Sequence, residues 1–224
     1  MTHKELLIFD LDDTLFDYVQ TEIFAIKAAC LAQDIPFDEN TYKVYKRANN
    51  LAKKELPSYI MNLPQFRMLR ADKFFELMSL NSKDKDRFIA DYMNASQTGV
   101  LFDDVEDVLR QLNKFRKVIG TNGSTFPRYQ KLINSSIRDC FDGFYSSEML
   151  DVSKPDNRFY EAIIQKETVS KERVLVIGDN LETDIYGAIN AGIECCLIDR
   201  KGKYDNVADA IVIHEFGQLA NILK

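Results

Sequence analysis

Acidic residues follow two apolar stretches of the sequence, at the point where each stretch ends. The stretch "LLIF" is followed by Asp10 and Asp12, and "VLVIG" is followed by Asp179 and Asp184. Carboxylates this close repel one another, and burial raises the cost. A divalent cation offsets this repulsion, and Mg²⁺ binds one or two carboxylates while keeping open positions. Asp10, Asp12 and Asp179 therefore predict an Mg²⁺ site.

Hydroxyl, amide and ammonium groups follow the same pattern. Thr14 lies just after Asp12, Thr121 and Asn122 follow the apolar stretch "KVIG", and Lys154 precedes a helix-like segment. A lysine and hydroxyls hold a substrate oxyanion, and a carboxylate is a nucleophile. Together with a metal ion, these groups indicate phosphoryl transfer, in which positioning and charge stabilisation do most of the work.

Each of these signals also has an ordinary structural interpretation. "TNG" is a common turn, Lys154 before a proline is a common surface residue, and "GDNLETD" is a possible helix N-terminus capped by Asp179 or Asn180. The functional interpretation depends on their order, because all four motifs occur at predicted strand ends or just before a helix.

Strand-like and helix-like segments alternate along most of the chain. Val- and Ile-rich runs predict strands at 6–9, 117–120, 174–178, 195–198 and 210–213, and apolar residues spaced three and four apart predict helices between them. This order indicates an α/β fold, a doubly wound Rossmann-like parallel sheet. Ligands bind beyond the carboxyl ends of such strands, where the polar residues lie.

The segment after the first strand interrupts this alternation. No strand of similar quality appears before 117–120, and the intervening segments are helical in pattern. A helical insertion fits better than a long loop. We therefore expect a catalytic core formed by 1–16 and 98–224, and a helical cap at 17–97.

Composition and charge exclude several classes of protein. The net charge of −6 has the wrong sign for binding a nucleic-acid polymer. No apolar run is long enough to span a membrane, and the start lacks a signal-peptide pattern. Four cysteines without framework spacing predict reduced thiols and a cytoplasmic location, and the two histidines lack metal-ligand spacing. The sequence carries no signal for an oligomeric state.

Basic residues are concentrated in the predicted cap. Residues 43–73 contain eight basic and two acidic residues. This excess fits either a solvated helix face or a lid that attracts a small anion. Arg67 and Arg70, one helical turn apart, are the candidates for contacting the substrate.

With these motifs in order, the chain resembles the haloacid dehalogenase-like hydrolase superfamily, and the insertion resembles its helical cap type. The resemblance implies that Asp10 is the nucleophile and forms an aspartyl phosphate, and that Asp12 protonates the leaving oxygen and then activates water. It implies that Asp10, the Asp12 backbone carbonyl and Asp179 hold Mg²⁺. Asp184 would support this site, and Thr121 and Lys154 would bind the phosphoryl group.

Asp12 identifies the branch as a phosphatase, because dehalogenases of the superfamily lack an acid/base Asp at this position. The stretches "FDLDDTLFDY" and "TDIYGAINAGIECCLID" most resemble pyrimidine 5′-nucleotidases, so we expect a small phosphorylated metabolite as substrate, with nucleoside 5′-monophosphates favoured. The alternatives are a phosphatase or mutase acting on sugar phosphates or phosphoglycolate, and a non-enzymatic phosphoacceptor module.

Overall fold

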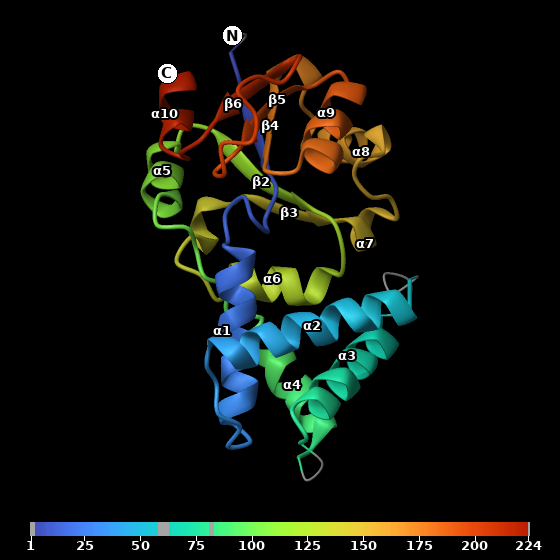
Figure 1. The fold of residues 1–224 in the computed structure, drawn as a ribbon. Coiled ribbons are helices and arrows are strands. Elements are labelled where there is room, and N and C mark those ends of the chain that lie inside the picture. Colours follow the sequence, from blue (N-terminus) through green and yellow to red (C-terminus); the bar gives the residue numbers. More distant parts are fainter. Residues whose placement is uncertain (1–2, 58–62, 81–82, 224) are drawn as a thin grey trace. The chain divides into compact units, whose positions relative to one another are not determined.

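The computed structural model describes residues 3–57, 63–80 and 83–223. The chain divides into two compact units (Figure 1). The core unit comprises Met1–Tyr18 and Gly99–Lys224, and the cap unit comprises Val19–Thr98. Within the described residues, no helix is both long and apolar enough to cross a lipid bilayer.

The described part of the core unit contains one sheet of six parallel strands, in the order β3-β2-β1-β4-β5-β6. This confirms the predicted α/β fold with a doubly wound sheet. The first strand is central, and Phe9 at its end is level with Ile119 and Ile177 on the neighbouring strands. The strands are β1 (Leu6–Phe9), β2 (Arg116–Thr121), β3 (Gly143–Ser146), β4 (Val174–Gly178), β5 (Glu194–Ile198) and β6 (Ala210–Ile213).

Strand β1 is buried on both faces, as expected for the centre of a parallel sheet. Its side chains alternate between two apolar clusters. Leu7 and Phe9 belong to one cluster, and Leu6 and Ile8 belong to the other. The strand is therefore fixed from both sides, and so is the chain that leaves its carboxyl end.

Helices connect the strands of the core unit. They are α5 (Val105–Gln111), α6 (Thr125–Ile133), α7 (Ser147–Leu150), α8 (Asn157–Glu167), α9 (Tyr186–Asn190) and α10 (Gln218–Ile222). Short 3₁₀ turns lie at η2 (Arg138–Cys140) and η3 (Lys171–Arg173), and a π-helical turn, η4 (Leu181–Ile185), follows β4.

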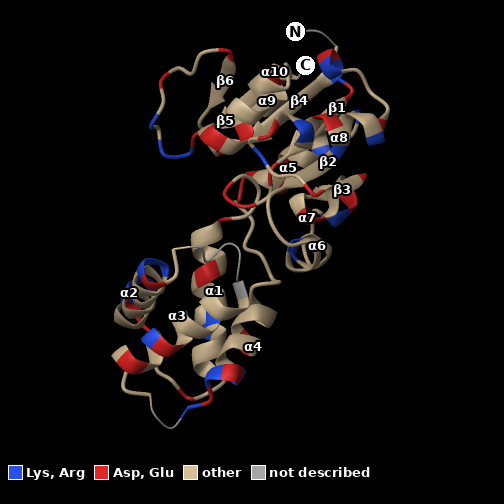
Figure 2. Ribbon diagram, turned by 90° about the vertical axis from the view of Figure 1, so that its right-hand side faces the viewer, with Lys and Arg blue, Asp and Glu red and all other residues tan. Residues whose placement is uncertain are grey.

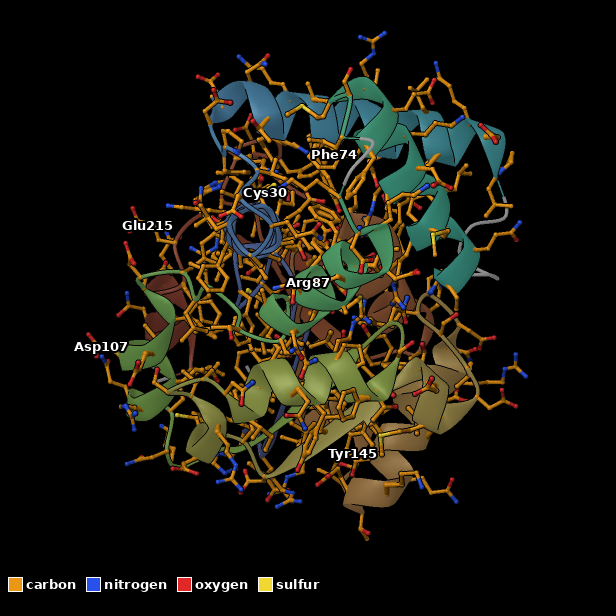
Figure 3. All side chains as sticks on the ribbon, turned by 90° about the horizontal axis from the view of Figure 1, so that it is seen from below. Cys30, Phe74, Arg87, Asp107, Tyr145 and Glu215 are labelled. Atoms are coloured by element: carbon orange, nitrogen blue, oxygen red, sulfur yellow. The ribbon has the colours of Figure 1, made fainter. Side chains whose placement is uncertain are left out.

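The cap unit is helical in its described residues, with α1 (Tyr18–Leu31, which starts at the end of the core unit), α2 (Glu39–Glu55), α3 (Leu63–Leu77) and α4 (Lys85–Ala95). Aromatic rings fill its centre. The rings of Phe74 and Phe88 stack with centroids 5.3 Å apart, and Tyr45 packs edge-on against Phe74 at 5.6 Å. Figure 3 shows Phe74 and Cys30 among the cap helices. Both belong to a buried apolar cluster of the unit, so the cap has a core of its own.

Carboxylates of the cap unit pair with part of its basic excess. Lys43 pairs with Glu39, and the Lys46 ammonium lies 2.9 Å from Glu22. Figure 2 shows both basic and acidic residues on the helices of the cap unit. The side chain of Glu22 is buried, and the Tyr42 hydroxyl also donates to it at 3.0 Å. One of the cap's lysines thus neutralises a buried acid.

Candidate active site

The turn after β1 places Asp10 and Asp12 at the carboxyl edge of the sheet. The Asp10 backbone N–H donates to the Ile177 carbonyl at 2.9 Å, which continues the pairing with β4 one residue beyond β1. The side chain of Asp10 is 13% exposed. This nearly buried carboxylate therefore has a position set by the sheet.

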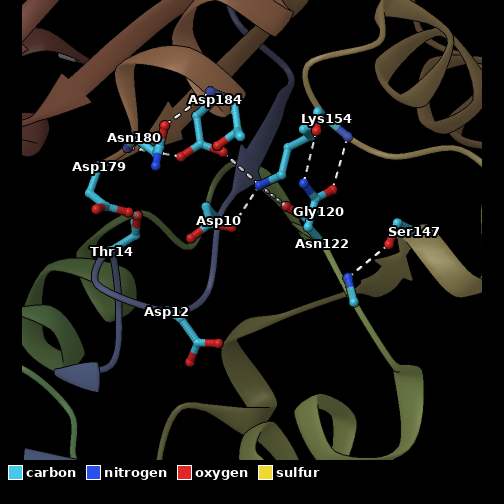
Figure 4. Close-up of polar contacts among 12 residues, drawn as sticks. Asp10, Asp12, Thr14, Gly120, Asn122, Ser147, Lys154, Asp179, Asn180 and Asp184 are labelled. Carbon is cyan, nitrogen blue, oxygen red and sulfur yellow. Dashed lines mark hydrogen bonds and ion pairs between the residues drawn. The ribbon is translucent and has the colours of Figure 1, made fainter. Parts of the chain in front are cut away.

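Lys154 connects three segments of the core unit. Its Nζ donates to Asp10 Oδ1 at 2.6 Å, to Asp184 Oδ1 at 2.6 Å and to the Gly120 carbonyl at 2.9 Å. All three donors of the ammonium are used (Figure 4), and its side chain is 2% exposed. The negative charges of Asp10 and Asp184 outweigh desolvation and raise the pKa of Lys154. Lys154 is therefore a fixed positive charge beside Asp10.

Asn122 fixes the backbone of Lys154. The Asn122 amide donates to the Lys154 carbonyl at 2.9 Å and accepts from the Lys154 backbone N–H at 2.9 Å. This pair of bonds joins the loop after β2 to the loop before α8. Thr121, the last residue of β2, is buried at the same edge of the sheet. The predicted contacts of Thr121 and Asn122 with substrate remain predictions.

The loop after β4 supplies two further carboxylates. The Asn180 side chain caps the turn η4 by accepting from the Glu182 and Thr183 backbone N–H groups. This turn brings Asp184 back against the strand end, where a Cβ on Gly178 would lie 2.4 Å from the Asp184 carboxylate. Glycine is needed at 178 because the acid approaches the backbone so closely.

Asp10, Asp179 and Asp184 form an acidic group whose oxygens lie within 4.8 Å of one another. Both oxygens of Asp184 are engaged, one by Lys154 and the other by the Asn180 backbone N–H at 3.1 Å. Among the residues that the structure describes, Asp179 accepts only a long bond from the Thr14 hydroxyl, at 3.3 Å. Asp10 Oδ2 has no hydrogen-bond partner among the described residues. The available oxygens therefore belong to Asp10 and Asp179.

Two carboxyl groups of this acidic group have raised pKa values. Burial, followed by the negative charges of Asp10 and Asp184, raises the pKa of Asp179 to about 8. Burial also raises the pKa of Asp10, although Lys154 opposes the shift. Two acids with raised pKa values and available oxygens suit a divalent cation with few protein ligands, and this donor set fits Mg²⁺.

The side chain of Asp12 has different neighbours (Figure 4). Lys131 Nζ on α6 lies 2.5 Å from Asp12 Oδ1, and Arg128 Nε lies 3.7 Å from Oδ2. Burial alone would raise the pKa of Asp12, but the charges of Lys131 and Arg128 and the hydrogen bond from Lys131 lower it. The Asp12 carboxylate is thus held by cations of the core unit, outside the acidic group.

The profile of the haloacid dehalogenase-like hydrolase family matches residues 4–192, most of the chain. The chain belongs to this family. Relatives of the hydrolase have several activities.

A pyrimidine 5′-nucleotidase, PynA of Streptococcus pneumoniae, is 33% identical to the hydrolase over 197 residues, which is 85% of this chain and 81% of that protein. A glyceraldehyde 3-phosphate phosphatase of Methanothermobacter thermautotrophicus is 27% identical to the hydrolase. The match covers 97% of this chain and 98% of that protein. The crystal structure of YfnB, a HAD-hydrolase from Bacillus subtilis bound to magnesium, is similar to this structure with a TM-score of 0.79. The match covers 100% of both chains, with 26% sequence identity. A haloacid dehalogenase of Pseudomonas fluorescens is also a relative.

The two arginines predicted to contact the substrate lie on α3 of the cap unit. The Arg70 guanidinium lies over the rings of Tyr92, Tyr45 and Phe66, at 4.9, 5.1 and 5.6 Å. Burial and the charge of Arg70 lower the pKa of Arg67. The structure therefore places these two cations close together, and their contact with substrate remains a prediction.

The residues that hold Asp12 were not among those predicted from the sequence. Lys131 and Arg128 follow "TNG" at helical spacing, but so do many surface residues, and their pairing with Asp12 depends on the sheet order. A spacing of three residues on the helix after the second strand was the one available signal.

We expect Mg²⁺ to raise the melting temperature of the hydrolase, with a larger gain at higher pH. The raised pKa values of Asp10 and Asp179 stabilise the metal-free protein in acid, and this contribution is lost as the pH rises from 3.8 toward about 8. At higher pH the metal binds the ionised carboxylates and restores the stability of the folded protein. Scanning calorimetry between about pH 6 and about pH 9 measures the gain. An equally large gain in Asp179→Asn would contradict the assignment.

Proposed function

We propose that the hydrolase is an Mg²⁺-dependent phosphomonoesterase that acts through an aspartyl phosphate on Asp10, with pyrimidine nucleoside 5′-monophosphates as favoured substrates. The supporting observation is the environment of Asp10. One oxygen accepts from Lys154 at 2.6 Å, the other has no partner among the described residues, and Asp179 lies beside it.

In the proposed mechanism the available oxygen of Asp10 attacks phosphorus and the ester oxygen leaves. Bound Mg²⁺ would supply positive charge that offsets the carboxylates and the phosphoryl oxygens, with Asp10, the Asp12 carbonyl and Asp179 as its protein ligands. Lys154 holds Asp10 in place and brings a positive charge beside the phosphoryl group. Thr121 completes the binding of the phosphoryl group. Asp184 fixes Lys154 from the opposite side.

Asp12 has two proton transfers in this mechanism. Lys131 and Arg128 lower the pKa of Asp12, so its carboxylate must first take up a proton. The protonated group then donates this proton to the departing alkoxide, and the resulting carboxylate takes a proton from the water that hydrolyses the aspartyl phosphate. A halide needs no proton on leaving, so a carboxyl group at this position favours phosphate esters over haloacids. Asp12 therefore favours the activity of the nucleotidase and phosphatase relatives over the activity of the dehalogenase.

The relatives support the choice of substrate. The most identical of those described above is a pyrimidine 5′-nucleotidase, and the glyceraldehyde 3-phosphate phosphatase favours sugar phosphates as the second candidate class. We propose that Arg67 and Arg70 bind the leaving group of this small metabolite. The four cysteines are free, which supports a reducing, cytoplasmic location.

A substrate panel tests the proposal. Purified protein with Mg²⁺ is incubated with pyrimidine nucleotides, purine nucleotides, sugar phosphates and phosphoglycolate, and inorganic phosphate is measured with and without a chelator. We expect release to be fastest from pyrimidine nucleotides and to stop when the metal is removed. Isomerised sugar phosphate with little free phosphate would indicate a mutase instead, and stable phosphorylation without turnover would indicate a phosphoacceptor module.

A further inference from the structure

Arg128 lies on α6, and its side chain is 29% exposed. Its Nε lies 3.7 Å from Asp12 Oδ2, too far for a hydrogen bond, and this nitrogen is buried without a hydrogen-bond partner. Among the described residues, none accepts a hydrogen bond from the guanidinium. A guanidinium has five N–H donors, so Arg128 offers unused donors beside the catalytic turn.

Asp12 does not need Arg128 for neutralisation. Lys131 Nζ lies 2.5 Å from the same carboxylate, and the Lys131 side chain is 8% exposed. By comparison, Arg200 of the core unit pairs with Asp104 at 2.9 Å. Lys131 is therefore the cation that neutralises Asp12, and the second acid near Arg128 is Glu148, whose pKa the guanidinium helps to lower.

The loop after β2 leaves space for the Arg128 guanidinium. Gly123 has φ = +112°, and a Cβ at this residue would lie 2.4 Å from Arg128 Nη1. The Gly123 backbone N–H donates to the Ser147 hydroxyl at 2.7 Å, which fixes the loop. The guanidinium therefore lies between this loop and Asp12, the residue to which the proposed mechanism assigns the leaving oxygen.

We propose that Arg128 is a substrate-binding residue that donates hydrogen bonds to oxygen atoms of a sugar-type leaving group. This inference rests on the proposed function and adds to it a specificity determinant in the core unit. Hydroxyl, ring and carbonyl oxygens near the ester accept from a guanidinium, and an aryl alcohol has no such oxygens near the ester. Arg128 thus selects phosphate esters of ribose or of small sugars over aryl phosphates.

The test compares two substrates in one variant. In Arg128→Met, kcat/KM for a nucleoside 5′-monophosphate or ribose 5-phosphate should fall about 10- to 100-fold, whereas that for p-nitrophenyl phosphate should fall less than about threefold. Inhibition by inorganic phosphate, which has no leaving group, should be unchanged. Arg128→Lys keeps the positive charge but lacks the planar set of guanidinium donors, and it should lose part of the discrimination between the two substrates. Arg110→Met, at an exposed ion pair on α5, is the control.

Equal losses on both substrates with weaker phosphate inhibition would overturn the proposal, because Arg128 would then act on the phosphoryl group or through Asp12. Unchanged kinetics on both would overturn it as well. These results leave the proposed function intact. A wild-type protein that releases phosphate from neither substrate would overturn the proposed function and this inference together.

Discussion

Asp10→Asn should abolish phosphate release while the fold is retained. The amide has nearly the same shape as the carboxylate but cannot form the aspartyl phosphate, so we expect turnover to fall on the order of 10⁴-fold or more. The variant also removes one negative charge from a buried acidic group, and burial already raises the pKa of Asp10. Without metal, the melting temperature should therefore equal or exceed that of the wild type.

Steady-state phosphate release and calorimetry in chelator measure both parts of this prediction. Asp103→Asn, an exposed acid of the core unit, is the matched control and should change neither quantity. Substantial turnover by Asp10→Asn, after deamidation back to Asp has been excluded by mass spectrometry, would show that another residue attacks phosphorus.

Lys154→Met should be the variant with the largest combined loss of activity and stability. It leaves Asp10 and Asp184 facing each other without their shared cation, and it leaves the Gly120 carbonyl without its donor. Breaking a buried ion pair in this way costs about 3–5 kcal/mol. The loss should be greatest at high pH, because the raised pKa of Asp10 lets this carboxyl be protonated at low pH, where it no longer needs the ammonium.

Thermal unfolding of Lys154→Met across a pH series checks this result. Lys166→Met on α8 is the control, because Lys166 is exposed and, within the described residues, no hydrogen bond or ion pair joins it to the acidic group. A variant that unfolds at the wild-type temperature at every pH would mean that Lys154 does not neutralise the acidic group.

The grouping of Asp10 and Asp179 was predictable because both follow strands that are themselves easily recognised. The stretches "LLIF" and "VLVIG" are continuous apolar runs, and both form buried strands that place Asp10 and Asp179 at one edge of the sheet. Strand β3 was not predicted, because "GFYS" is short, begins with glycine and is only partly buried. Its pairing with β2 comes from tertiary structure.

The neighbours of Asp12 were also beyond sequence reasoning. Alternation along an extended chain predicts that Asp10 and Asp12 share a face, and the sequence therefore groups their carboxylates. In the structure, Lys131 holds the Asp12 side chain while Lys154 holds Asp10. These two ion pairs join residues 119 and 144 positions apart, and no local pattern encodes such pairs.

Locating the covalent phosphoryl group tests the central claim most directly. In Asp12→Asn, p-nitrophenyl phosphate should still phosphorylate the protein, because nitrophenolate leaves without a proton, whereas hydrolysis of the acyl phosphate slows for lack of a base. Rapid acid quenching and peptide mass spectrometry should then find one phosphoryl group on the peptide that contains Asp10. A phosphoryl group on any other residue, or nitrophenolate release without a phosphorylated protein, would contradict the account.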